Sequence, residues 1–473
     1  MVDGREIAAQ FEDAADFETR KVLCGGQLLT VLFLDGLTSG RDIAEQVLRP
    51  LAQMTDEARE EVLYTRALQG GVWCASVKEP ESTQQAAELL VNGFCVILFP
   101  KSGKALGCEV KTGEKRSPSP PETENTVKGA KDAFTETLRT NTSLVRRHLR
   151  TPGLRLTETV VGKRTLTKVT VCWIDRLTDP ELPRRMQERL SSIDIDGALS
   201  PAAIEEYVTG SRRTAFPLLE YTERTDHFCQ GLLDGQVGLL ADGLPLGYLA
   251  PVGLGRLMRS PEDRATDFFS ASMLRLLRYA ALGVSLLLPA LYAAMAMFHQ
   301  QMLPTKLLLS IIESKQNVPF STLLEVLGLL CAFELLQQAG LHLPQAVGTA
   351  VSIIGGLVVG TAAVDAKLVS PAALIVTASS GICGFTLPNR ELSDAVRLWR
   401  FVLTVLAGLW GLFGVTVGLL LLLTELAGLE SLGRSYLSPF GRAEVKGALV
   451  RPRLVRQKWR DGALKPMDDQ NQR

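Results

Sequence analysis

The first 270 residues of this 473-residue chain contain no apolar run long enough to cross a bilayer, and the chain carries no net charge. Lys and Arg together number 51, as do Asp and Glu, so no overall field favours nucleic acid or acidic substrates. The first twenty residues are polar and acidic and have no apolar core, so they do not form a secretory signal peptide. We therefore expect the front half to stay in the cytoplasm.

The sequence also lacks the common catalytic and cofactor motifs. None of the four His residues has HExxH spacing, and neither a GxSxG elbow, a P-loop nor a dinucleotide fingerprint is present. The eight Cys residues are scattered without a CxxC pair, which disfavours a zinc site or a disulfide framework. We expect no enzymatic activity, no cofactor and no metal.

Four apolar stretches are concentrated in the last two hundred residues. They cover residues 277–298, 347–364, 372–387 and 401–426. The first and last are long enough to cross a bilayer core of about 30 Å as helices. Residues 305–340 are apolar too but carry five charged residues, which favours two interfacial or broken helices over one span. We predict an all-α multispan membrane domain.

The front half has an α/β pattern in two subdomains. Short apolar runs at 27–37, 92–100 and 165–175 predict strands, and residues 236–251 predict a hairpin that turns at Asp242-Gly243. Helices are expected between the strands, over 132–150 and 179–193 among others. The predicted domains are a cytoplasmic α/β subdomain at 1–110, a Pro/Ser/charge-rich linker at 111–129, a second α/β subdomain at 130–255, an amphipathic connector at 256–275, the membrane domain at 276–430 and a basic cytoplasmic tail at 431–473.

The basic residues that flank the first span and the basic tail predict that both ends of the membrane domain lie in the cytoplasm. That arrangement requires an even number of crossings. The basic run 389–400 opposes the simplest four-span drawing, so the topology stays open.

Long stretches of the chain resemble the A-subunit family of bacterial spore germination receptors, which includes the stage V sporulation protein AF. The most similar runs are LRYAALGVSLLLPALYAAMAMFHQQMLPTKLLLSI, VPFSTLLEVLGLLCAFELLQQAGLHLPQAVGTAVSIIGGLVVGTAAVDAKLVSP, FTLPNRELSDAVRLWRF and SLGRSYLSPF. Weaker similarity extends upstream, so the resemblance covers most of residues 130–440. Two departures are Gln337-Gln338, where the family usually has Arg-Glu, and Thr361, where it tends to have Gln.

The resemblance implies a function in the spore inner membrane. Members of the family assemble with an integral-membrane B subunit, which binds small nutrients, and with a lipoprotein C subunit. The A subunit is thought to form a pentameric channel for monovalent cations, and its opening starts germination. Two alternatives remain, a non-conducting scaffold and a secondary transporter, although no internal repeat supports the latter.

The small-residue stretch 347–364 has two interpretations. Small residues let helices pack closely in a bilayer, and they also line narrow pores. In the second interpretation the pore-lining residues are Gly355, Val358, Val359, Gly360 and Thr361.

Four carboxylates are candidates for a cation pathway. Glu313, Glu325 and Glu334 belong to membrane-depth segments, where a carboxylate is costly unless it is paired or faces water. Glu325 and Glu334 are nine residues apart and cannot face one channel from a straight helix, so we retain Glu334 as the pathway candidate. Asp365 is a candidate for a pore mouth, with a solvated loop charge as the alternative.

Asn141, Arg146 and Arg147 lie in the family-like helix TNTSLVRRHL. A solvated basic face is the simplest interpretation of each, and contact with a partner subunit is the other.

Overall fold

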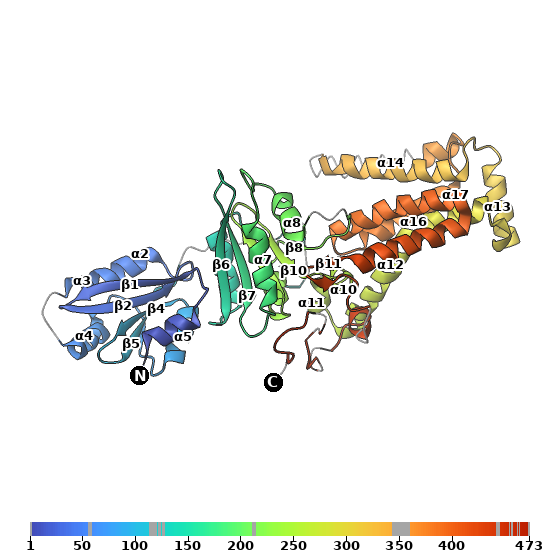
Figure 1. The fold of residues 1–473 in the computed structure, drawn as a ribbon. Coiled ribbons are helices and arrows are strands. Elements are labelled where there is room, and N and C mark those ends of the chain that lie inside the picture. The colour runs from blue at the N-terminus through green and yellow to red at the C-terminus, as the bar shows by residue number, and fades with distance from the viewer. Residues whose placement is uncertain are drawn as a thin grey trace.

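The computed structural model describes residues 2–54, 59–112, 121, 124, 128–210, 214–342, 360–440, 445–453, 455, 457–460, 462 and 464–471. Two α/β units and a helical domain follow one another along the molecule (Figure 1). The N-terminus lies in the first unit, and the last helices of the chain lie in the helical domain (Figure 1). The predicted fold class, an α/β front half followed by a helical membrane half, is confirmed.

The first unit is a five-stranded antiparallel sheet of order β1-β2-β4-β5-β3. Its strands are β1 Phe17–Cys24, β2 Gln27–Leu34, β3 Val77–Lys78, β4 Phe94–Phe99 and β5 Lys104–Glu109. One face packs under η1 Ile43–Leu48, α3 Arg49–Gln53, α4 Glu60–Arg66 and η2 Ala67–Gly71. The other face packs under α1 Gly4–Gln10 and α5 Thr83–Val91. Because helices cover both faces, all six residues of β4 are buried, as its unbroken apolar sequence predicts. The short α2 Gly40–Asp42 precedes η1.

The second unit repeats this architecture with the strand order β6-β7-β9-β10-β8. Its strands are β6 Leu154–Val161, β7 Thr167–Ile174, β8 Glu220–Thr222, β9 Val237–Ala241 and β10 Gly247–Ala250. Helices α7 Glu181–Ser191 and α8 Pro201–Thr209 cover one face. Helices α6 Leu138–His148 and α9 Thr225–Leu233 cover the other. The predicted hairpin at Asp242-Gly243 joins β9 to β10, and Gly243 has the positive φ of 84° that its turn requires.

The helical domain begins with two short helices, α10 Leu254–Leu257 and α11 Glu262–Ala265. The longer helices are α12 Phe268–Met297, α13 Thr305–Lys315, α14 Thr322–His342, α16 Pro371–Phe385 and α17 Arg390–Gly428, and η3 Gln300–Met302 follows α12. Within the described residues, α12, α14 and α17 are long and apolar enough to cross a membrane. For residues 305–340, the structure has two helices, as predicted, and the second is long and apolar enough for a full span.

Helix α17 folds back on itself, which corrects the prediction of a single span over 401–426. Gly411 has φ 63° and ψ −142°, a conformation accessible to glycine alone, and it reverses the chain. Gly418 lies against the side chain of Leu403. Near the end of α17, Glu425 accepts a hydrogen bond from Thr214, which lines one cavity together with Glu391 and Asp394 near the start of α17. The element is therefore a pair of antiparallel arms, 390–410 and 412–428, of about 30 and 25 Å.

The end of α17 returns to the second α/β unit. β11 Glu430–Ser431 and β12 Arg434–Ser435 form a small hairpin beside α7, where Arg434 pairs with Asp179. Further on, α18 Val445–Leu449 contacts the start of α12 through Arg275. Both ends of the helical domain thus lie on the side of the α/β units, which is the arrangement expected for an even number of crossings.

Candidate functional site

Two arginines lie between one third and one half of the way along the first arm of α17. Arg397 and Arg400 are seven and ten residues from the start of the arm at Arg390, which places them about 10–15 Å along its length of roughly 30 Å. Charged side chains at such a depth are expensive unless they face the bundle interior and are paired, and they commonly mark functional sites. Their surroundings are therefore the best candidate site in the helical domain.

Arg397 pairs with a carboxylate of the neighbouring helix. Its Nη1 lies 2.8 Å from Oε1 of Glu334 on α14, and its other terminal nitrogen binds Asp394 one turn earlier. The exposed fractions of the two side chains are 13% for Arg397 and 29% for Glu334. The candidate pathway residue Glu334 is thus held in an ion pair.

Arg400 is more deeply buried, with 1% of its surface exposed. Its Nη1 donates to the hydroxyl of Ser380 on α16 at 3.1 Å, and this hydroxyl donates to the backbone carbonyl of Ser285 on α12 at 2.7 Å. These bonds tie three helices together. The Nε and Nη2 atoms of Arg400 have no hydrogen-bond partner within the described part of the chain.

The other carboxylates of this region contact different elements. Glu325, at the start of α14, is buried, forms an ion pair with Lys315 at 3.3 Å and accepts a hydrogen bond from the backbone N–H of Ser370. Glu313 on α13 is exposed. Glu325 and Glu334 therefore do not share one surface, as their spacing predicted.

Most of the predicted pore-lining residues, Gly355, Val358 and Val359, lie outside the described residues. Gly360 is buried, and a Cβ there would lie 3.6 Å from the side chain of Leu374 on α16. It lines a cavity of about 180 Å³ between α14 and α16. Thr361 and Asp365 are exposed, the latter at the end of a short helical segment, 360–365. The structure thus brings Gly360 next to α14, the helix of Glu334.

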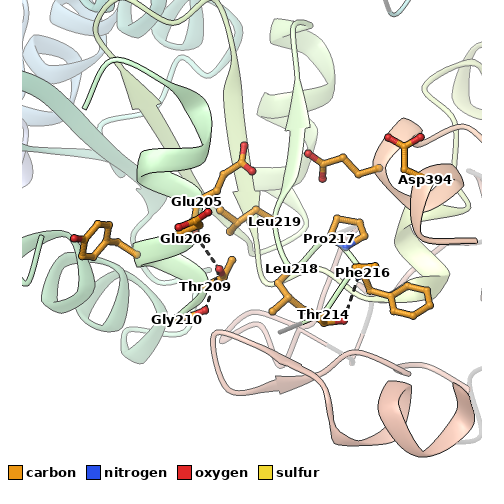
Figure 2. A pocket seen from close by; sticks show the side chains of 13 residues that line it. Glu205, Glu206, Thr209, Gly210, Thr214, Phe216, Pro217, Leu218, Leu219 and Asp394 are labelled. Carbon is orange, nitrogen blue, oxygen red and sulfur yellow. Dashed lines mark hydrogen bonds between the residues drawn. The ribbon is translucent and has the colours of Figure 1, made fainter. Parts of the chain in front are cut away.

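A larger cavity of about 1030 Å³ lies where the second α/β unit meets α17 (Figure 2). Figure 2 shows Glu205 and Glu206 of α8 on one side and Asp394 of α17 on the other. Burial, with a smaller contribution from the Glu206 carboxylate, raises the pKa of Glu205 above its usual value. Asp394 belongs both to this cavity and to the Arg397 ion pair, so the two features are contiguous.

A family model described as the Bacillus/Clostridium GerA spore germination protein matches residues 5–466. The chain belongs to this GerA family. Among its relatives, the Bacillus subtilis membrane protein YfkQ, described as uncharacterized, is 36% identical over 439 residues, which are 92% of this chain and 84% of YfkQ. Spore germination protein KA of Bacillus subtilis is 34% identical over 456 residues, covering 94% of this chain and 83% of the relative. GerLA of Bacillus cereus is 31% identical over 444 residues, covering 93% and 90%.

A solved structure also matches part of this GerA chain. It is the N-terminal domain of the A subunit of the Bacillus megaterium spore germinant receptor GerK3, with 23% identity and a TM-score of 0.41 over 52% of this chain and 92% of that one. Membership of the family supports a role in spore germination, and the three apolar helices indicate a membrane-associated protein. The predicted family and the keywords spore germination, germinant receptor and membrane protein are confirmed.

Sequence reasoning missed the arginines of this site. The run 389–400 was interpreted only as surface charge that affects topology, whereas it forms the first half of a membrane-length arm. A usable signal was present, because Arg397 and Arg400 are three residues apart and share a helix face that runs on into the apolar residues from Phe401.

Proposed function

We propose that this protein is a germinant-receptor subunit of the spore inner membrane that forms a homo-oligomeric, ligand-gated channel for monovalent cations. Its α/β units face the cytoplasm, and it has no catalytic activity. An integral-membrane B subunit and a lipoprotein C subunit complete the receptor, and a pentamer is the oligomer that the family resemblance implies. The observation that carries this proposal is the Glu334–Arg397 ion pair at membrane depth.

Ionised groups within apolar helices are retained where they serve ion or proton pathways or the movements that open them. Here the pair joins α17 to α14. Apolar side chains of α14 are left uncovered by the rest of the described chain, for example Leu324 and Leu335, which are 59% and 71% exposed. One chain has too few helices to enclose a wide pore, so copies related by cyclic symmetry would place the same helix around one axis. Gly355, Val358, Val359, Gly360 and Thr361 would line this pore, with Glu334 and Asp365 along the cation pathway.

The test is potassium efflux from liposomes that contain the purified protein, alone and with its B and C partners. Glu334→Gln should change the efflux rate, because it removes a charge next to the pathway, whereas the matched change Glu313→Gln at an exposed site of α13 should not. Val358→Ala should widen the narrowest ring and raise the basal leak.

Three outcomes would contradict the proposal. Absence of efflux in every complex, with germination that still requires the protein, would favour the scaffold. Efflux that requires a counter-ion gradient would favour a transporter. A basal leak unaffected by Val358→Ala would assign 347–364 to helix packing.

A further inference from the structure

We propose that α14 has a second stable register on the first arm of α17, displaced by three residues, slightly less than one helical turn, in which Glu334 leaves Arg397 and pairs with Arg400. This inference rests on the proposed function, for which it supplies a switching element between two channel states. Its physical basis is a set of unpaired atoms that one displacement would satisfy together.

Four side chains at the contact leave buried polar atoms without a hydrogen-bond partner among the residues described. The atoms are Oε2 of Glu334, Oε1 of Gln337, Nε of Arg397, and Nε and Nη2 of Arg400. Buried polar groups are bonded in the great majority of cases, and a buried guanidinium such as that of Arg400, which forms no ion pair among the residues described, is a costly exception. The observed register therefore leaves part of each of these groups without a hydrogen bond.

The two helices run antiparallel in a defined register. A Cβ on Gly408 would collide with the side chain of Leu323, so these two residues face each other, as do Glu334 and Arg397. Leu323 lies eleven residues before Glu334, and Gly408 lies eleven residues after Arg397, so both contacts belong to one register.

A displacement of α14 by three residues toward the Gly411 turn, about 4.5 Å, would bring Glu334 opposite Arg400. Gln337 would then lie opposite Arg397, because Gln337 follows Glu334 by the same three residues that separate Arg400 from Arg397. Arg400 gains a carboxylate and Arg397 gains an amide oxygen. Side chains of the two helices interdigitate, as Leu323 does over Gly408, so the contact favours two discrete positions over continuous sliding.

The start of α14 holds the observed register. Glu325 is anchored there by Lys315 and by the backbone N–H of Ser370 at the start of α16. Moving α14 along its axis pulls Glu325 away from Ser370. The observed register is thus favoured by the Glu325 contacts and the second by Arg400, which is the balance that a two-state element requires.

Intramolecular disulfide trapping tests this directly in the full chain in nanodiscs, with Cys331 and Cys383 replaced by Ser. The pair L323C/G408C reports the observed register. The pair V326C/G408C reports the second register, because Val326 is three residues further along α14. This variant also carries L323A, because the side chain of Leu323 would collide with a Cβ at position 408. The ratio of the two disulfide yields, measured after oxidation by copper phenanthroline and peptide mass spectrometry, gives the balance of registers.

Arg397→Gln should raise the 326–408 yield relative to 323–408 about tenfold, since Glu334 loses a charge-assisted bond in the observed register alone. Arg400→Gln should lower the same ratio. A merely structural role predicts the same direction of change for both variants, so opposite directions are diagnostic. Glu325→Gln, which spares both arginines, should also raise the ratio and keeps the test valid if Arg397→Gln fails to fold.

The inference is overturned if Arg397→Gln and Glu325→Gln leave the ratio unchanged, or if Arg400→Gln raises it. The disulfide ratio does not depend on conduction. Opposite shifts without potassium efflux would therefore contradict the channel and leave the two registers standing, whereas efflux with an unchanged ratio would contradict only the registers.

Discussion

A buried ion pair joins the two α/β units, and removing its negative charge should lower the free energy of unfolding of the front half strongly. Asp16, between α1 and β1, receives two hydrogen bonds from Arg146 of α6, Nε to Oδ2 at 2.8 Å and Nη2 to Oδ1 at 2.7 Å. The two side chains are 2% and 0% exposed. Asp16→Asn keeps the shape but leaves a buried guanidinium uncompensated, which costs about 3–5 kcal/mol.

Pulse proteolysis of the detergent-solubilised chain in urea measures this loss. With a denaturant slope of about 2 kcal/mol per molar urea, the unfolding midpoint of the front half should fall by about 1.5–2.5 M. The second ion pair across the same joint, Arg139–Asp35, is 34% and 46% exposed, so Asp35→Asn should cost less than about 1 kcal/mol. Replacing both members of the buried pair, by D16L/R146M, should restore most of the stability. Equal losses for Asp16→Asn and Asp35→Asn would refute the reasoning.

Two further predictions concern a pH-sensitive contact and the α17 turn. The hydrogen bond that His148 donates through Nε2 to Oδ2 of Asp132, at 2.7 Å, raises the pKa of His148 above 6.5. The contribution of this bond to stability is complete below that value and is lost as the pH rises through the folded-state pKa. The urea midpoint of unfolding should therefore fall as the pH rises above 6.5, and an unchanged pH dependence in His148→Gln would contradict this cause. Gly411→Ala places a side chain in a left-handed backbone conformation and puts its Cβ 2.8 Å from His299, so the thermal unfolding temperature should fall by several degrees. Gly283→Ala, whose Cβ would meet nothing within 4 Å, should leave this temperature unchanged. Equal shifts in the two variants would exclude the turn as the cause.

The sequence predicted buried elements better than exposed ones. β4 and β7 have unbroken or alternating apolar residues and were predicted as strands. The edge strands β1 and β6 carry charged residues on their open faces, so their periodicity is diluted, and both were missed. The basic helix α6 was interpreted as a solvated face, which is wrong for Asn141 and Arg146, because both are buried by the neighbouring unit and by its own loop.

The candidate site depends on contacts that no local pattern encodes. Glu334 is a candidate from sequence alone, because a carboxylate at membrane depth needs a partner. Its partner Arg397 is 63 residues away, and the pairing follows from the antiparallel register of α14 and α17. The reversal at Gly411 was missed for a similar reason. The predicted stretch 401–426 has ten residues before this glycine and fifteen after it, and its composition is the same whether the helix continues or folds back.

The reversal of α17 has a mechanical consequence for the proposed receptor. Both arms end at the second α/β unit, the first where Asp394 lines the junction cavity and the second where Glu425 binds Thr214. Just beyond the second arm, the hydroxyl of Ser431 donates to the carbonyl of Leu218 at 2.6 Å and accepts from a buried backbone N–H at 3.0 Å. A rotation of this unit therefore acts on both ends of the arm pair. Since Asp394 also binds Arg397, the same rotation would reach the Arg397–Glu334 ion pair, so a continuous set of contacts connects the second α/β unit to α14.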